Sequence, residues 1–156
     1  MTRPLLILLA TLGSVALLGG AFAFQYIGGM APCQLCLWQR WPHAAAIGLG
    51  TVALLAPGLS RLLSVLGAAA ALTSAGIAAF HTGVERKWWE GLTSCSSGSI
   101  RGVPVTDLLD PTVAVAAPVR CDAVAWQMLG LSMASWNMLA SLALVAVWLI
   151  SARRRA

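Results

Sequence analysis

The sequence predicts an all-α membrane protein built as a bundle of four transmembrane helices. Of its 156 residues, 59% are hydrophobic and only 10% are charged, whereas soluble domains carry about 25% charged residues. Four apolar stretches are long enough to cross a hydrocarbon core about 30 Å thick. They cover about residues 5–26, 41–56, 62–80 and 135–150. No internal repeat or linker-like composition divides the chain, so residues 1–156 are expected to form one membrane domain.

The first stretch follows Arg3 and contains "AFA" at 21–23, which resembles the cleavage site of a secretory signal. However, its apolar run is longer than a usual signal core and continues past that site. We therefore expect an uncleaved membrane anchor.

The second and third stretches are joined by "APGLSR" at 56–61, a tight turn that predicts an antiparallel helical hairpin. Pro42 is predicted in the first turn of the second helix, where its missing N–H costs little. The second and fourth stretches are short and are expected to gain length from flanking residues.

The charges predict the topology. Arg3, Arg61 and the run 153–155 are basic with no acid among them, whereas all five acidic residues lie within 81–134. The positive-inside rule then places both termini and the Arg61 turn in the cytoplasm, and the 27–40 and 81–134 loops on the outer face. The net charge of +5 is too scattered along the chain for a nucleic-acid-binding stripe.

All four cysteines, Cys33, Cys36, Cys95 and Cys121, fall in these two outer loops. In an oxidising compartment they can form two structural disulfides. A zinc site with four sulfurs is a second alternative, but Cys95 and Cys121 lack a partner at short spacing, and we predict no metal.

The pair in "APCQLCLWQRW" favours redox chemistry, because a disulfide across two intervening residues constrains the unfolded chain little. Cys36 lies near the predicted start of the second helix, where the helix dipole favours a thiolate. Arg40, four residues on, shares its helical face and can stabilise an anion. The alternative for Arg40 is an interfacial side chain that reaches the lipid headgroups.

The long outer loop has two further features. Cys95 lies in "TSCSSGS", a small and polar stretch that indicates exposure to a soluble partner, and the apolar segment 105–119 is expected along the membrane surface. His81 and the residues up to Leu92 form an amphipathic pattern, and six of the seven tryptophans fit an interfacial aromatic belt.

The chain resembles the DsbB family in three features. These are the motif "PCQLCLWQR", the two pairs of cysteines in the two outer loops, and the four spans with both ends inside. The resemblance covers nearly the whole chain, including "LGLSM" at 129–133. It implies a bacterial inner-membrane oxidoreductase that re-oxidises the periplasmic thiol oxidase DsbA and passes electrons to a quinone, either ubiquinone or menaquinone.

The resemblance also implies roles for single residues. Cys95 matches the cysteine attacked by reduced DsbA, Cys121 would then attack Cys33, and Cys36 would become the thiolate that meets the quinone. Arg40, His81, Gly130 and Met133 match positions near the quinone ring. For His81 the alternative is a histidine bonded to headgroups, and for Met133 it is simple packing.

Two other functions stay open at this point. One is a reductase that runs the exchange backwards, as in proteins similar to vitamin K epoxide reductase. The other is a membrane scaffold with two inert disulfides. The two-and-two division of cysteines and the position of Arg40 favour the quinone-dependent oxidase.

Overall fold

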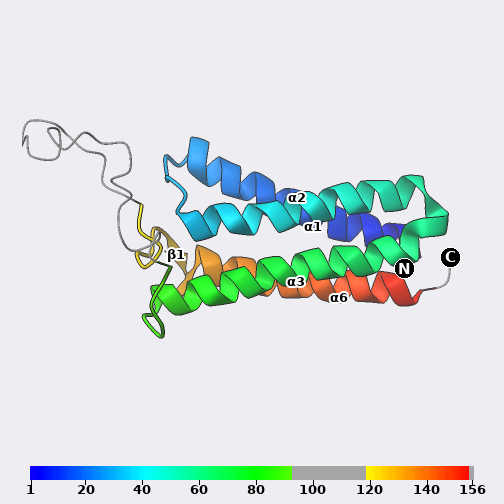
Figure 1. Cartoon of the computed structure of the whole chain (residues 1–156). Coiled ribbons are helices and arrows are strands. Elements are labelled where there is room, and N and C mark those ends of the chain that lie inside the picture. The colour runs from blue at the N-terminus through cyan, green and yellow to red at the C-terminus, as the bar shows by residue number, and fades with distance from the viewer. Residues whose placement is uncertain (93–118, 155–156) are drawn as a thin grey trace, which may run out of the picture.

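Four long helices run side by side in the computed structural model, which describes residues 1–92 and 119–154 (Figure 1). They are α1 (Arg3–Tyr26), α2 (Gln34–Leu55), α3 (Ser60–Glu85) and α6 (Met133–Arg153). A 3-10 helix, η1 (Pro57–Leu59), joins α2 to α3, and a hairpin of β1 (Gln127–Met128) and β2 (Leu131–Ser132) precedes α6. Helix α3 packs against α2 and α6, and α1 packs against the same two helices.

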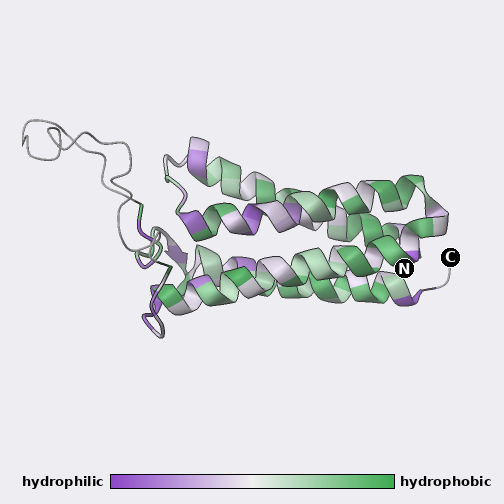
Figure 2. Ribbon diagram, in the orientation of Figure 1, coloured by the Kyte–Doolittle hydropathy of each residue, from purple (hydrophilic) through white to green (hydrophobic). Residues whose placement is uncertain are grey.

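The helices have the composition of a membrane bundle. Within the described residues, α1, the stretch Pro57–Glu85 and α6 are long and apolar enough to cross a membrane. Only 22–39% of the residues in these spans are buried by the bundle, so most of their apolar side chains face outward, as lipid permits. Figure 2 shows hydrophobic residues along most of each helix and hydrophilic ones near the ends. The prediction of a helical membrane protein is confirmed.

Helix α2 is not among those three spans. Its first half contains polar residues, including Gln39 and Arg40, and Pro42 lies between Trp41 and His43. Figure 2 shows hydrophilic residues interspersed with hydrophobic ones in this half of α2. These polar side chains turn out to face the candidate site.

The start of α2 differs from the sequence prediction. The helix begins at Gln34 and not near residue 41, so half of the 27–40 segment is helical and Pro42 lies inside the helix, not in its first turn. The reason is a cap that hydropathy does not detect: the Cys33 sulfur accepts a hydrogen bond from the backbone N–H of Cys36 at 3.2 Å, which satisfies one of the free donors of the first turn.

The other helices also extend past their apolar cores. Helix α3 continues to Glu85, five residues beyond the predicted end, so His81 is helical; α6 runs from Met133 to Arg153. The Ser132 hydroxyl caps α6 by accepting from the N–H of Ser135 at 3.2 Å. Cys95 and the segment 105–118 lie outside the described residues.

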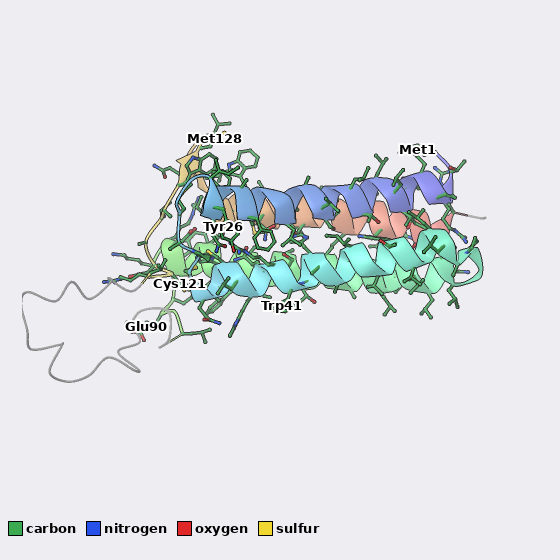
Figure 3. The ribbon with its side chains drawn as sticks, turned by 90° about the horizontal axis from the view of Figure 1, so that it is seen from above. Met1, Tyr26, Trp41, Glu90, Cys121 and Met128 are labelled. Atoms are coloured by element: carbon green, nitrogen blue, oxygen red, sulfur yellow. The ribbon has the colours of Figure 1, made fainter. Side chains whose placement is uncertain are left out.

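The start of α1, the end of α6 and η1 lie at one end of the bundle (Figure 1). Arg3 donates to the Ser60 hydroxyl at 3.1 Å and to the backbone carbonyl of Arg154. Figure 3 shows Cys121 and Met128 at the opposite end from Met1. The three cysteines that the structure describes and the described chain ends are therefore separated by the length of the bundle.

The half of the bundle near the termini has an apolar core around Trp148, whose side chain is fully buried. Ile7, Ala10, Ala53, Leu63, Ala68 and Ala71 make up the rest of this cluster. Gly67 lies against the indole so closely that an added Cβ would be 2.8 Å from the ring. Tight contact between small residues and one large ring is how helices pack without a hydrophobic driving force between them.

Candidate functional site

The two cysteines of the CxxC motif lie where α2 begins. Cys33 is the N-cap and is 5% exposed, while Cys36 is half-buried in the first turn. Their sulfur atoms are 2.8 Å apart, and both thiols are free. Because the cap geometry holds both sulfurs at the helix N-terminus, they are close enough to exchange between dithiol and disulfide with little backbone movement.

Cys121 joins this pair from the other side of the chain. It is fully buried and packs with Cys33, Leu35 and Val84 in one group of side chains, here called the sulfur cluster. The Cys121 sulfur is engaged in a disulfide. The structure therefore brings together three of the four predicted catalytic cysteines. The fourth, Cys95, lies outside the described residues.

The residues beside Cys121 form an exposed ion pair. The Arg120 guanidinium donates two hydrogen bonds to the Asp122 carboxylate, at 2.8 and 2.6 Å. These hydrogen bonds hold the pKa of Asp122 below its ordinary value. The exposed pair thus flanks Cys121, whose own side chain is buried.

The two CxxC sulfurs are not equivalent. The pKa of the Cys33 thiol is raised above its ordinary value, first by its hydrogen bond with the Cys36 sulfur and then by burial. Cys33 therefore keeps its proton, and Cys36 is the sulfur that ionises first. The N–H groups of the first turn of α2 and the helix dipole stabilise a thiolate there.

His81, on α3, faces the same sulfurs. Its Nε2 is 3.7 Å from the Cys33 sulfur and 3.8 Å from a carboxylate oxygen of Glu85, and its Nδ1 is 3.0 Å from the side-chain nitrogen of Gln39. The ligand atoms of Cys33, Cys36 and His81 lie within 4.8 Å of one another. Such a set has the chemistry to bind a soft divalent ion, although the absence of a metal stays our prediction.

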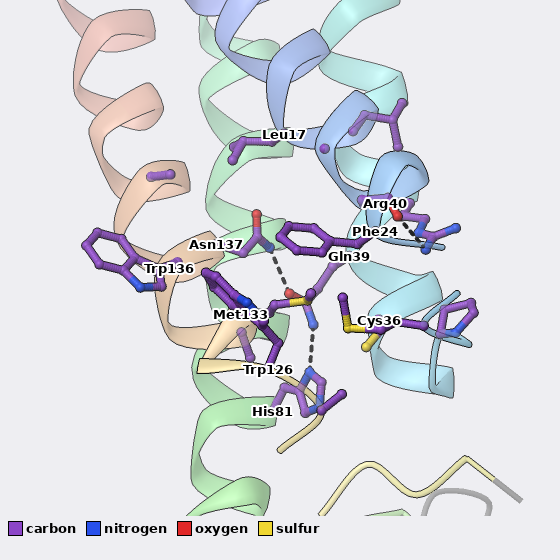
Figure 4. A pocket seen from close by; sticks show the side chains of 18 of the residues that line it. Leu17, Phe24, Cys36, Gln39, Arg40, His81, Trp126, Met133, Trp136 and Asn137 are labelled. Carbon is purple, nitrogen blue, oxygen red and sulfur yellow. Dashed lines mark hydrogen bonds between the residues drawn. The ribbon is translucent and has the colours of Figure 1, made fainter. Parts of the chain in front are cut away.

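A cavity of about 430 Å³ opens beside Cys36, between α1, α2, α6 and the segment that leads to the hairpin (Figure 4). Apolar and aromatic side chains form most of its walls, among them Leu17, Phe24, Trp126, Met133 and Trp136. Its polar lining residues are Cys36, Gln39, Arg40, His43, His81 and Asn137. A mainly apolar cavity with a few polar groups is typical of a small-molecule site.

Arg40 lines the cavity and contacts α1. Its guanidinium donates to the side-chain oxygen of Gln25 at 2.5 Å and stacks 4.9 Å from the ring centroid of Phe22. Its Nε–H is buried and has no hydrogen-bond partner among the described residues. Because it lines the cavity, Arg40 brings a permanent positive charge to the cavity wall.

Sequence reasoning missed a chain of polar side chains that crosses the cavity. Asn137 on α6 donates to the Gln39 side-chain oxygen at 2.7 Å, and Gln39 in turn donates to His81 (Figure 4). His43 bonds Asn137 at 3.0 Å. The available signal was the spacing of Cys36, Gln39, Arg40 and His43, which recurs at the helical intervals of one face.

The last two predicted site residues have different positions. Met133, the first residue of α6, lines the cavity. Gly130 is not among its lining residues and occupies the two-residue turn between β1 and β2, with φ +76°. Leu129 beside it has φ +54°, and such paired left-handed residues are the geometry of a tight hairpin turn, which favours glycine.

The fold and the site together define a helical membrane protein that holds a reactive pair of cysteines at the edge of an apolar cavity. A sequence model for "Disulfide bond formation protein DsbB" matches residues 3–151. Disulfide bond formation protein B of Methylococcus capsulatus is 34% identical over 149 residues, with 92% of this chain and 90% of the relative covered. The proteins of the same name from Azoarcus and Stutzerimonas stutzeri are 32% identical (89% and 87% covered) and 31% identical (92% and 91% covered). No solved structure matches the chain.

The chain belongs to the DsbB family. It is therefore a membrane oxidoreductase of disulfide bond formation, as the resemblance in the CxxC region implied.

Proposed function

We propose that this protein re-oxidises a periplasmic dithiol oxidase of the DsbA type and transfers the electrons to a membrane quinone. A quinone bound in the cavity would supply the acceptor chemistry, taking up two electrons and two protons. The observation that carries the proposal is the position of Cys36, whose side chain belongs to the sulfur cluster and also lines the apolar cavity.

The cluster supports a relay of thiol–disulfide exchanges. A thiolate of the reduced partner attacks Cys95 of a Cys95–Cys121 disulfide and releases Cys121 as a thiolate. Cys121 then attacks Cys33 of a Cys33–Cys36 disulfide, so that one S–S bond forms, one breaks and Cys36 leaves as the thiolate. The packing of Cys121 with Cys33 and the preference of Cys36 for ionisation both favour this direction.

The cavity fits a quinone head group on its chemistry. Its walls are apolar and aromatic, and the permanent charge of Arg40, which lines it, would stabilise a ring oxygen that gains negative charge. Gln39 donates to the Nδ1 of His81, so the Nε2 of the neutral ring carries the hydrogen and can donate it to a thiolate at Cys33. Met133, Trp126 and Trp136 would pack against the ring.

We further propose four spans, with α2 as the fourth, in a bacterial inner membrane. Both termini and η1 would face the cytoplasm, and the sulfur cluster would face the periplasm. The gathering of Arg3, Arg61, Arg153 and Arg154 at one end of the bundle supports this orientation through the positive-inside rule. A membrane-impermeant thiol reagent, applied to intact cells after their disulfides have been reduced, should then label Cys36; labelling only after lysis would contradict the orientation.

The direct test follows quinone absorbance when purified protein is mixed with a reduced DsbA-type partner and a short-chain ubiquinone. We expect steady quinone reduction that Cys36→Ser abolishes and that Thr73→Val, an exposed α3 variant, leaves unchanged. In Cys121→Ala the partner should be trapped as a mixed disulfide at Cys95. Wild-type protein that consumes no quinone would overturn the proposal and favour a reductase or a scaffold.

A further inference from the structure

Glu85 is a buried carboxyl group that the proposed relay does not use. It is the last residue of α3, and its side chain is only 6% exposed. One carboxylate oxygen accepts a hydrogen bond from the Ser132 hydroxyl, and the other is 3.8 Å from the Nε2 of His81. Burying a carboxyl group costs free energy, so its place beside the sulfur cluster points to a chemical role.

A second, smaller cavity of about 40 Å³ lies between Glu85 and the CxxC sulfurs. Cys33, Cys36, His81 and Glu85 all line it, and so does the exposed Arg120. A cavity of this volume has room for a water molecule, and these polar side chains supply the hydrogen-bond partners that a buried water needs. The cavity therefore gives a proton a short path between the two sulfurs and the Glu85 carboxyl group.

The His81 ring has no free lone pair with which to take a proton in this cavity. The Gln39 amide nitrogen donates to the Leu35 backbone carbonyl at 3.1 Å, and this bond fixes the direction of the amide. The same nitrogen donates to the Nδ1 of His81 at 3.0 Å and occupies the lone pair of the neutral ring. The hydrogen of the ring is then on Nε2, on the side of Cys33 and Glu85. Of the described side chains that line the small cavity, Glu85 is the only carboxylate.

Cys33 requires a base. Its hydrogen bond with the Cys36 sulfur and its burial raise the pKa of the Cys33 thiol, so this thiol keeps its proton. The thiolate is the nucleophile in disulfide chemistry. Cys33 must therefore lose its proton before the Cys33–Cys36 disulfide can form again.

The surroundings of Glu85 suit a group that accepts and then releases a proton. The Ser132 hydroxyl donates to it, and Arg86 and Arg120 bring positive charge, so these neighbours favour the ionised carboxylate. Burial acts in the opposite direction and favours the protonated form. The other titratable or charged groups near Glu85 are His81 on its own helix, the CxxC thiols on α2, and Asp122, which pairs with Arg120.

We propose that Glu85 is the base that accepts the Cys33 proton when the CxxC disulfide forms again. This inference rests on the proposed function, in which the pair cycles between dithiol and disulfide. The proton moves from the Cys33 sulfur through the small cavity to the Glu85 carboxylate, which leaves a thiolate and a carboxylic acid. No electron moves in this step. The S–S bond then closes as the pair gives two electrons to the acceptor, and Glu85 returns its proton to water on the side of Arg120.

The test separates the closing step from quinone chemistry. In a full-length Cys95→Ala, Cys121→Ala background, the reduced CxxC pair is mixed with dipyridyl disulfide, a small uncharged oxidant. The Cys36 thiolate attacks the oxidant, forms a mixed disulfide and releases one pyridinethione. Cys33 then attacks the Cys36 sulfur, so that the internal disulfide forms, the mixed disulfide breaks and a second pyridinethione leaves. Stopped-flow absorbance of the pyridinethione resolves the two releases.

We expect Glu85→Gln to slow the second release roughly 100-fold, a usual contribution of a general base, without slowing the first. With Glu85 present, the rate of the second release should level off as the pH rises, whereas in Glu85→Gln it should keep rising with the hydroxide concentration. In Glu85→Ala, added formate should restore the second release, because it supplies the missing carboxylate. Glu90→Gln, which neutralises an exposed carboxylate beyond the end of α3, should change neither release.

A second release at the unaltered rate in Glu85→Gln would overturn the inference. An equal slowing of both releases would also overturn it, since that result is expected of a purely structural residue. If Glu85→Gln does not fold, Glu85→Ala with and without formate decides the same question. Wild-type protein that consumes no ubiquinone would overturn the proposed function, whereas the two releases would still report on Glu85.

Discussion

The two halves of the bundle differ in what their interiors contain. Near the termini, the interior is apolar and is organised around one fully buried ring, Trp148. Near the sulfur cluster, the interior holds a cavity and a chain of amides and imidazoles that includes Gln39, His81 and Asn137. The same four helices pass through both halves. In each helix, the half near the termini therefore contributes mainly to stability, and the half near the sulfur cluster contributes to chemistry.

Among changes in the half near the termini, Trp148→Ala should destabilise the protein most. Removing a buried tryptophan leaves a cavity that small neighbours such as Gly67 cannot fill, and we expect a loss of about 3–5 kcal/mol in the free energy of unfolding. Thermal or denaturant unfolding in detergent measures it. Turnover per folded molecule should not change, and a parallel loss of turnover would contradict the separation of the halves.

The strongest non-cysteine change in the other half is Arg40→Gln. It removes a charged donor to the cavity, and hydrogen bonds to charged groups contribute about 1.5–3 kcal/mol, which corresponds to roughly 10- to 100-fold in quinone turnover. Steady-state kinetics with the reduced partner measures it. Arg40→Lys, which keeps the charge but not the planar fork, should fall between the two. If Arg40→Gln retains full activity, Arg40 acts only in packing against Phe22 and Gln25.

A smaller effect is expected from Asn137→Leu, which interrupts the polar chain. The variant removes one buried partner each from Gln39, which keeps its bonds to Leu35 and His81, and from His43, which keeps its bond to Ser74. Each lost bond costs about 0.5–1.5 kcal/mol in unfolding free energy. Denaturant unfolding of the variant beside Ser14→Ala, which removes a buried hydroxyl without a partner among the described residues, gives the comparison. A larger loss in Ser14→Ala would show that the polar chain adds no stability.

The smallest expected effect is a difference between the rates at which the two CxxC cysteines are alkylated. Because the pKa of Cys33 is raised and its side chain is buried, the thiol remains protonated at pH 8. Iodoacetamide should therefore modify Cys36 roughly tenfold faster than Cys33 in reduced protein, since the thiolate is the nucleophile. Mass spectrometry of peptides from a brief labelling pulse measures the ratio. Equal labelling of both residues would remove the proposed order of ionisation.

The sequence alone predicted the apolar parts of these helices and the motif that carries the chemistry. Hydropathy located all four stretches, because a long run of leucine, alanine and valine predicts a membrane-spanning helix. It failed at the start of α2, where a cysteine acts as the cap and helical residues such as Gln34 and Arg40 are polar. Pro42 strengthened the error, because proline is common in first turns and rare inside helices.

The candidate site divides in the same way. The sequence indicated Cys33, Cys36, Cys121, Arg40 and His81, and the structure brings these residues to one end of the bundle. It gave no sign that Asn137 and Ser74, which lie on α6 and α3, meet His43. Contacts between distant helices depend on rotation about the helix axis, which periodicity fixes only for strongly amphipathic segments.

The cavity is lined largely by α1 and α6, two helices whose outer faces are apolar. A small apolar occupant is therefore expected to arrive by lateral diffusion within the bilayer and not from bulk water. Its half-saturating level should then follow the number of occupant molecules per lipid, so diluting vesicles with extra phospholipid would slow the reaction even when the volume concentration stays constant.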